Sequence, residues 1–296
     1  MHKLWTIISA EYRLEVRSKS FWLTTLLFPV FIIGLGGLVA YLSAESDAMK
    51  AAGEMAPHAN EMTGIQALGM MGGMFLTLFV IMYGSMIFNK VKAEKTNRIV
   101  EVLVSCVSGR SLMFAKVISV AFVGLTQIFV WSLFIVGGVI ALLLLAPGDF
   151  DMAAIWDIRV LKALLFSLLF FAGGFSFYGA LFAVAGALTD RNNENQGYLS
   201  ILMMLLMVSF YLGMFAVDNT GALATFCFYL PFTSPTVATV QTISAVPWYY
   251  GMLSLIILYA SAAVTLIFAG KVYTSAILLN GKKLSPRDII VFLKAK

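Results

Sequence analysis

The sequence predicts an all-α integral membrane protein with six transmembrane helices, an amino-terminal interfacial helix and an outer re-entrant segment. Hydrophobic residues make up 60% of the chain and charged residues 12%, whereas a soluble domain carries about a quarter charged residues. The mean hydropathy is +0.92. Six apolar runs are long enough to cross a bilayer as helices. They account for most of the chain, so we expect one membrane domain and no sizeable soluble domain.

The first 20 residues predict an amphipathic helix that lies in the membrane interface rather than crossing it. Apolar residues share one face and basic residues lie around the other: Trp5, Ile8, Tyr12 and Val16 against Lys3, Arg13 and Arg17. The alternative is a simple charged leader in front of a membrane anchor.

The six predicted spans follow in order along the chain. They cover residues 21–42, 65–88, 117–146, 161–188, 196–217 and 248–270. The first contains Pro29, which predicts a kink. A cleaved signal peptide is the other interpretation of this first run. It is disfavoured because the apolar core is longer than a signal sequence needs and acidic residues precede it.

The distribution of basic residues predicts the orientation in the membrane. With the amino terminus in the cytoplasm, only Lys50, Arg159 and Lys162 of the 20 lysines and arginines fall on the outer side. This bias is the positive-inside pattern, and it places the charged loop 89–116 and the tail 271–296 in the cytoplasm. The pI of about 9.1 is then explained by topology and lipid contact rather than by nucleic-acid binding.

Residues 219–247 are unusual because they carry no charge and yet contain Pro231, Pro235 and Pro247. If they formed a seventh span, the last helix would be reversed and the basic tail would lie outside, against the charge pattern. We therefore expect a re-entrant segment on the outer side. Broken backbone at membrane depth is tolerated where it is buried in protein or lines a cavity.

The charged stretch from Asn89 to Lys116 is the longest polar island between two apolar runs. Wound as a helix over 93–106, it sorts into a polar and an apolar face: Glu94, Arg98, Glu101 and Ser105 against Ile99, Val102, Leu103 and Cys106. The spacings along the polar face allow ion pairs. A turn at Ser108-Gly109-Arg110 would end the helix. Taken alone, this pattern also fits a solvated loop that only sets the topology.

The run EKTNRIVEVLVSCVSGRSLMFAK resembles the cytoplasmic loop of ABC-2 type transporter permeases, in their sodium-efflux-like branch. The residues that match this loop are Glu94, Glu101, the Ser108-Gly109 turn and Lys116. The segment from Leu230 to Pro235 resembles the outer-face motif before the last span of that family. The tail, with Gly281 and Pro286, resembles the end of that branch, and Glu11 stands at a position that is commonly acidic there.

The resemblance implies a coupling helix that docks on a separate cytoplasmic ABC ATPase, which would bind the ATP and magnesium. The implied ATPase-coupling residues are Glu94, Arg98, Glu101 and Lys116, and the implied outer gate is Pro231, Phe232 and Pro235. A second permease subunit, identical or different, would complete the translocation path. The chain would lie in the plasma (inner) membrane with both termini in the cytoplasm.

Residue types that carry chemistry are scarce in the spans. Their interiors contain no Asp, Glu, Lys, Arg or His, which argues against a proton- or ion-driven carrier. The pairs Gly270-Lys271 and Gly281-Lys282 lack the remainder of a phosphate-binding loop. We therefore expect no enzyme activity, cofactor or metal in this chain. The Met70-Met71-Met74 cluster and the Gly69-to-Gly73 spacing fit helix packing better than copper binding.

Two functions from different classes remain open from the sequence. One is the permease subunit of an ATP-driven exporter, and the other is an ATP-independent pore or a scaffold subunit of another complex. Residues 43–64 form a short loop where the sodium-efflux-like branch usually has a larger domain. The substrate is therefore open among sodium, drug-like and lipid-like molecules.

Overall fold

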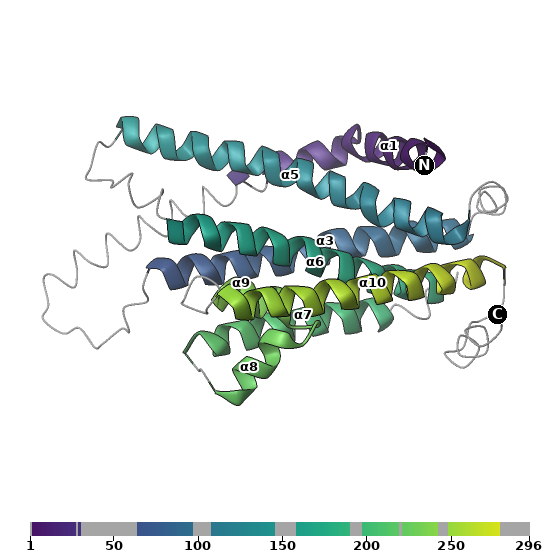
Figure 1. The fold of residues 1–296 in the computed structure, drawn as a ribbon. Coiled ribbons are helices and arrows are strands. Elements are labelled where there is room, and N and C mark those ends of the chain that lie inside the picture. Colours follow the sequence, from purple (N-terminus) through teal and green to yellow (C-terminus); the bar gives the residue numbers. More distant parts are fainter. Residues whose placement is uncertain are drawn as a thin grey trace, which may run out of the picture.

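The computed structural model of the chain is a bundle of long helices lying lengthwise against one another (Figure 1). It describes residues 2–27, 29–30, 64–96, 108–145, 158–189, 197–218, 221–241 and 248–278. Over these residues the chain is all-α and has no strand. Five helices are long and apolar enough to cross a membrane, namely α3 (Gly64–Thr96), α5 (Gly109–Leu145), α6 (Ile158–Leu188), α7 (Gly197–Asp218) and α10 (Trp248–Leu278).

The outward faces of these helices carry large apolar side chains that a soluble protein would bury. Met204, Tyr211 and Val264 are each exposed over more than 60% of their surface. A contiguous apolar surface of this kind is a liability in water but costs nothing against lipid tails. The predicted all-α membrane fold is thereby confirmed. The first predicted span lies mostly outside the described residues, of which 21–27 and 29–30 are helical.

Successive long helices run in opposite directions, so their ends collect at two ends of the bundle (Figure 1). Thr96, Gly109, Leu188, Gly197 and Leu278 lie at one end, which we call the charged end. The amino-terminal helix α1 (His2–Val16) packs against α5 near this end. The predicted amphipathic helix at the amino terminus therefore forms, and its apolar residue Ile8 is buried.

Two helices extend further into the charged stretch than hydropathy predicts. The span predicted to end at residue 88 continues as α3 to Thr96, and the span predicted to begin at residue 117 starts at Gly109. Ser108 explains the new start, because its hydroxyl accepts a hydrogen bond from the Ser111 amide at 3.4 Å and so caps the helix. The predicted coupling helix over 93–106 is described only up to Thr96, where it is part of α3; the remainder lies outside the described residues.

The uncharged, proline-containing segment forms two short helices, α8 (Ala222–Tyr229) and α9 (Ser234–Gln241), and the chain bends by 119° between them. Each is about 12 Å long at 1.5 Å per residue, too short to cross a bilayer. Gln241 donates a hydrogen bond to the carbonyl of Ala216 near the end of α7, and Ser254 near the start of α10 bonds to Phe228. Both arms therefore open toward the end of the bundle opposite the charged end. The pair is a sharply bent hairpin, the shape expected of the re-entrant segment that the sequence predicts, and we call it the re-entrant hairpin.

Candidate functional site

A buried lysine is the centre of the first polar region. Lys116 lies on α5 with only 2% of its side chain exposed. Its ammonium is 2.8 Å from Glu11 Oε1 on α1 and forms a second ion pair with Glu94 on α3. An unpaired buried ammonium would be too costly to maintain, so two carboxylates from two other helices are what allow this side chain to be buried.

A second layer of hydrogen bonds holds these carboxylates in place. The Tyr273 hydroxyl on α10 donates to Glu94 Oε2 at 2.6 Å, and Ser119 on α5 donates to Glu11 Oε2 at 3.2 Å. We call Glu11, Glu94, Lys116, Ser119 and Tyr273 the lysine cluster. It connects α1, α3, α5 and α10 at the charged end of the bundle.

Lys90 extends this network along α3 toward the surface. Its ammonium lies 2.9 Å from Glu15 and 3.6 Å from Glu11. Burial by itself would raise the pKa of the Glu11 carboxyl. The charges of Lys116 and Lys90, with hydrogen bonds from Lys116 and Ser119, outweigh burial and hold that pKa below its ordinary value. Glu11 is therefore ionised at neutral pH.

The structure brings two of the four predicted ATPase-coupling residues together. Glu94 and Lys116 pair directly with one another, on the two helices that flank residues 97–107. Because Lys116 is buried, its contacts are within the chain, and a direct contact with another protein stays a prediction. Arg98 and Glu101 lie outside the described residues.

The sequence analysis did not assign Lys90 or Tyr273 to the site, and it noted Glu11 only through the family resemblance. One local signal was available: Lys116 interrupts the otherwise apolar run from Leu112 to Ile118. A lone cation at such a position requires buried acidic partners. Which acids supply them depends on the tertiary packing of α1, and spacing along the chain does not reveal it.

The second polar region is the tip of the re-entrant hairpin, residues 230–233. Here the chain bends between α8 and α9, and hydroxyl side chains from three long helices donate hydrogen bonds to backbone carbonyls. Ser254 donates to the Phe228 carbonyl at 2.6 Å and Ser209 donates to the Thr233 carbonyl at 3.3 Å. Tyr178 donates to the carbonyl of Phe232. Satisfying backbone groups in this way is what permits irregular backbone inside a membrane protein.

Glycines make the space for α9 among α3, α6 and α7. A Cβ added to Gly174 would lie 2.6 Å from Pro235 Cβ, and one added to Gly213 would lie 3.5 Å from Val237 Cα. A Cβ added to Gly73 would lie closer still to a methyl group of Val240. The predicted close packing at Gly73 is thus packing within the chain, against α9.

The predicted outer-gate residues all belong to this hairpin. Phe232 is 37% exposed and packs edge-on against Phe177, with ring centroids 5.1 Å apart. Pro235 is buried against Gly174. The tip lies deep in the bundle, because its partner Tyr178 is ten residues from the end of α6 at the charged end, or about 15 Å. Whether these residues gate a path stays a prediction.

No group of three or more His, Cys, Asp or Glu side chains able to hold a metal ion occurs among the described residues. Both polar regions join helices to one another. Ion pairs do so at the charged end, and hydrogen bonds between uncharged groups do so at the hairpin tip. Such an arrangement can transmit and accommodate helix movement.

Comparison with known proteins identifies relatives of this chain. A family model described as "ABC-2 family transporter protein" matches residues 54–271. The chain is similar to uncharacterized protein YhaP of Bacillus subtilis (strain 168), with 24% identity over 73% of this chain and 53% of that protein. It is also similar to uncharacterized protein MJ1024 of Methanocaldococcus jannaschii, with 25% identity over 71% of this chain and 49% of that protein.

The chain thus spans about half the length of the curated relatives it matches. No solved structure matches it. The family model covers well over half of the chain, including every long helix that the structure describes from α3 to most of α10. The chain is a multi-pass membrane protein that belongs to the ABC-2 family of transporter proteins.

Proposed function

We propose that the chain is the permease subunit of an ATP-driven ABC-2 type exporter, and that it forms the translocation path with a second permease subunit. ABC-2 permeases are in general non-catalytic membrane subunits that work with a cytoplasmic ABC ATPase. The charged end would then face the cytoplasm, in agreement with the distribution of basic residues. Hydrolysis of ATP would take place on the partner chain.

The observation that carries this proposal is the lysine cluster. Glu94 and Lys116 stand close to the two ends of residues 97–107, and they pair with each other and with Glu11. Separating buried charges of opposite sign is strongly unfavourable. A displacement of residues 97–107 by an ATPase would therefore move α3, α5 and α1 together, while α10 follows through Tyr273.

Helix α10 offers a continuous connection from the lysine cluster to the hairpin. Tyr273 contacts Glu94 at the charged end, and Ser254 contacts Phe228 near the hairpin tip. The two residues are about 29 Å apart along an unbroken helix. A shift of α10 would change the contacts at the hairpin tip, where Phe232 would act as the gate residue. In this proposal Arg98 and Glu101 contact the ATPase, and Glu94 and Lys116 pass the movement on.

The coupling claim is tested by charge reversal with the chain in its native complex. The complex is purified through a tag on this chain, the co-purifying ATPase is identified by mass spectrometry, and ATP turnover is measured in proteoliposomes. Glu101→Lys should lose transport-coupled turnover while membrane insertion is unchanged. The double variant Glu94→Lys, Glu101→Lys should lose it too, and there the loss includes disruption of the lysine cluster. Lys162→Glu, an exposed charge at the other end of the bundle, serves as the matched control.

Unchanged turnover in the double variant would contradict the coupling claim. If no ATPase co-purifies, the chain is instead an ATP-independent pore or a scaffold subunit. Substrate identity is a separate question, for which sodium, drug-like and lipid-like molecules are the candidates. A proteoliposome transport panel of these three classes distinguishes them, and ATP dependence of any uptake supports the exporter role.

A further inference from the structure

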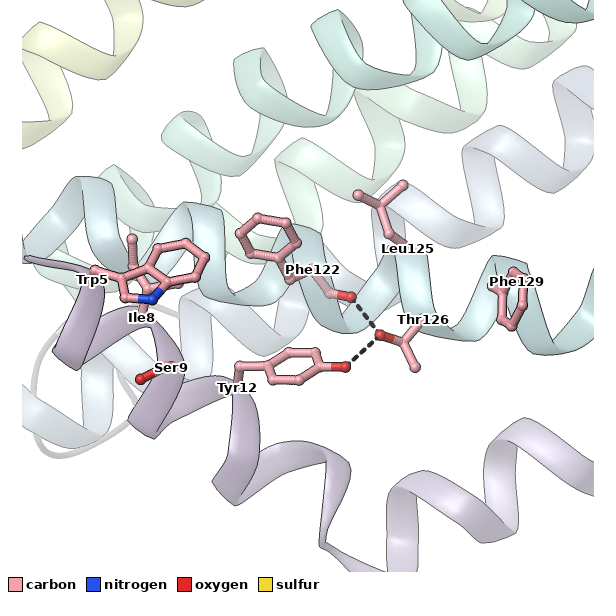
Figure 2. A pocket seen from close by; sticks show the side chains of 8 residues that line it. All are labelled: Trp5, Ile8, Ser9, Tyr12, Phe122, Leu125, Thr126 and Phe129. Carbon is pink, nitrogen blue, oxygen red and sulfur yellow. Dashed lines mark hydrogen bonds between the residues drawn. The ribbon is translucent and has the colours of Figure 1, made fainter.

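A groove lies between α1 and α5. It has a volume of about 540 Å³ and is lined from both helices by aromatic, aliphatic and hydroxyl side chains (Figure 2). Trp5 and Phe122 meet edge-on at one end, with ring centroids 6.2 Å apart. Trp5 and Phe129 are 62% and 63% exposed. The groove is therefore open along its side and large enough for a small organic ligand.

The hydroxyl groups in the groove are already paired, so its surface is effectively apolar. The Thr126 hydroxyl donates to the Phe122 carbonyl at 2.9 Å, and it accepts the hydroxyl proton of Tyr12 at 2.8 Å (Figure 2). The Ser9 hydroxyl donates to the Thr6 carbonyl at 3.2 Å. Water inside the groove would find few partners, whereas hydrocarbon would gain contact with the aromatic walls.

A basic side chain borders this apolar groove. Arg13 is exposed, and its guanidinium donates to the Ser9 carbonyl at 3.1 Å and to the Ser9 hydroxyl at 3.4 Å. These bonds hold the guanidinium beside a residue that lines the groove and use two of its five N–H donors. Arg17 and Lys19, which follow α1 in the chain, are exposed as well.

We propose that the groove binds an anionic phospholipid from the leaflet at the charged end, with an acyl chain in the groove and the phosphate on Arg13. A guanidinium matches phosphate geometry through paired N–H donors. Trp5, with its exposed ring, is the kind of aromatic residue that is enriched at the membrane interface. The exposed guanidinium of Arg13 beside this apolar groove favours an anionic lipid over a zwitterionic one, because the ammonium of a zwitterionic headgroup opposes its charge.

Native mass spectrometry of the full chain in detergent tests this proposal. Phosphatidylglycerol and phosphatidylcholine with identical acyl chains are titrated against the wild type and three variants. The wild type should bind phosphatidylglycerol several-fold more tightly. Arg13→Ala should weaken phosphatidylglycerol binding about fivefold, since one basic residue near a membrane surface contributes about that factor. Phosphatidylcholine binding should weaken less, because its choline ammonium offsets the phosphate charge, so the preference for phosphatidylglycerol should shrink.

Two further variants complete the test. Lys271→Ala removes an exposed basic residue from α10 at the same end of the bundle and should change neither affinity. Leu125→Trp places a larger side chain in the groove and should weaken both lipids equally. Circular dichroism and gel filtration check that each variant is folded.

Three results would overturn the proposal. The first is equal affinity of the wild type for the two lipids. The second is an Arg13→Ala variant with unchanged preference. The third is a dimer that dissociates in Leu125→Trp while lipid binding stays intact, which would assign the groove to a second copy of the chain.

Discussion

The lysine cluster and the hairpin tip are both polar regions inside an apolar bundle, but they are built from different chemistry. At the charged end, the ammonium of Lys116 is held by the carboxylates of Glu11 and Glu94. At the hairpin tip, neutral hydroxyls of Tyr178 and Ser254 hold backbone carbonyls. Formal charges thus lie at the helix ends, where water is close, and uncharged groups satisfy the backbone at depth.

This difference predicts different mechanical behaviour for the two regions. Separating a buried ion pair leaves an uncompensated charge, which costs several kcal/mol. A hydrogen bond between helices inside a membrane is worth only about 0.6 kcal/mol on average. The lysine cluster should therefore move as a unit, whereas the hairpin tip can exchange partners at low cost. The predictions below test this contrast, beginning with the largest expected effect.

Replacing the ammonium should produce the largest loss of stability. In Lys116→Met the carboxylates of Glu11 and Glu94 lose their common partner, so we expect the free energy of unfolding to fall by about 3–5 kcal/mol. Chemical denaturation in detergent micelles, followed by circular dichroism, measures this. Lys271→Met, an exposed lysine at the same end, should change stability by less than about 0.5 kcal/mol.

A second substitution separates lost charge pairing from lost packing. If the damage in Lys116→Met is mainly electrostatic, adding Glu11→Gln should restore part of the stability, because one of the two unpaired carboxylates is removed. A double variant that is less stable than Lys116→Met would show that packing dominates, and the contrast with the hairpin would be lost.

Adding a methyl group where α6 packs against α9 should have the next largest effect. An alanine Cβ at position 174 would lie 2.6 Å from Pro235 Cβ, so Gly174→Ala should destabilise the protein by about 1–3 kcal/mol. Gly137 on α5 has nothing within 4 Å of the same added atom, and Gly137→Ala should cause no loss. Equal thermal unfolding temperatures for the two variants would contradict the close packing of the hairpin.

The membrane fold follows from hydropathy, but the ends of its helices do not. A hydropathy boundary falls at Asn89, where polar residues begin, yet α3 continues to Thr96. Lys90 and Glu94 stay helical because partners from other helices pair with them. The partners of Lys90, Glu11 and Glu15, lie far away in the sequence. The partner of Glu94, Lys116, lies on the next long helix, so spacing along α3 alone could not have located the helix end.

For the hairpin, too, the sequence predicts the type of element but not its tertiary contacts. The absence of charge and the presence of Pro231 and Pro235 predict a re-entrant segment, and the structure has a helix pair bent by 119° there. The depth of its tip depends on Tyr178, Ser209 and Ser254, which lie on three different helices. A lone Ser or Tyr in an apolar run is too common to indicate such a contact.

Removing one hydroxyl at the hairpin tip should have a smaller effect than either change above. Tyr178→Phe leaves the carbonyl of Phe232 without this donor, and we expect a loss of about 1 kcal/mol. Tyr259→Phe removes a hydroxyl that donates to the Leu169 carbonyl from an exposed position and should cost less. A loss of 3 kcal/mol or more in Tyr178→Phe, by the same denaturation assay, would place the tip among the rigid regions.

The pH dependence of stability should distinguish the lysine cluster from the hairpin tip. The folded state holds the pKa of Glu11 below its ordinary value of 4.5, so folding favours the ionised carboxylate. Its contribution is fully present above that value and is lost as the pH falls through the lower folded pKa. Melting temperatures between pH 7 and pH 3 should therefore decline more steeply in the wild type than in Glu11→Gln. Among the described residues, the side-chain hydrogen bonds that hold the hairpin involve hydroxyl, amide and carbonyl groups rather than carboxylates. Tyr178→Phe should therefore lower the melting temperature by the same amount at every pH. Parallel curves for the wild type and Glu11→Gln would show that the lysine cluster does not depend on the ionised Glu11.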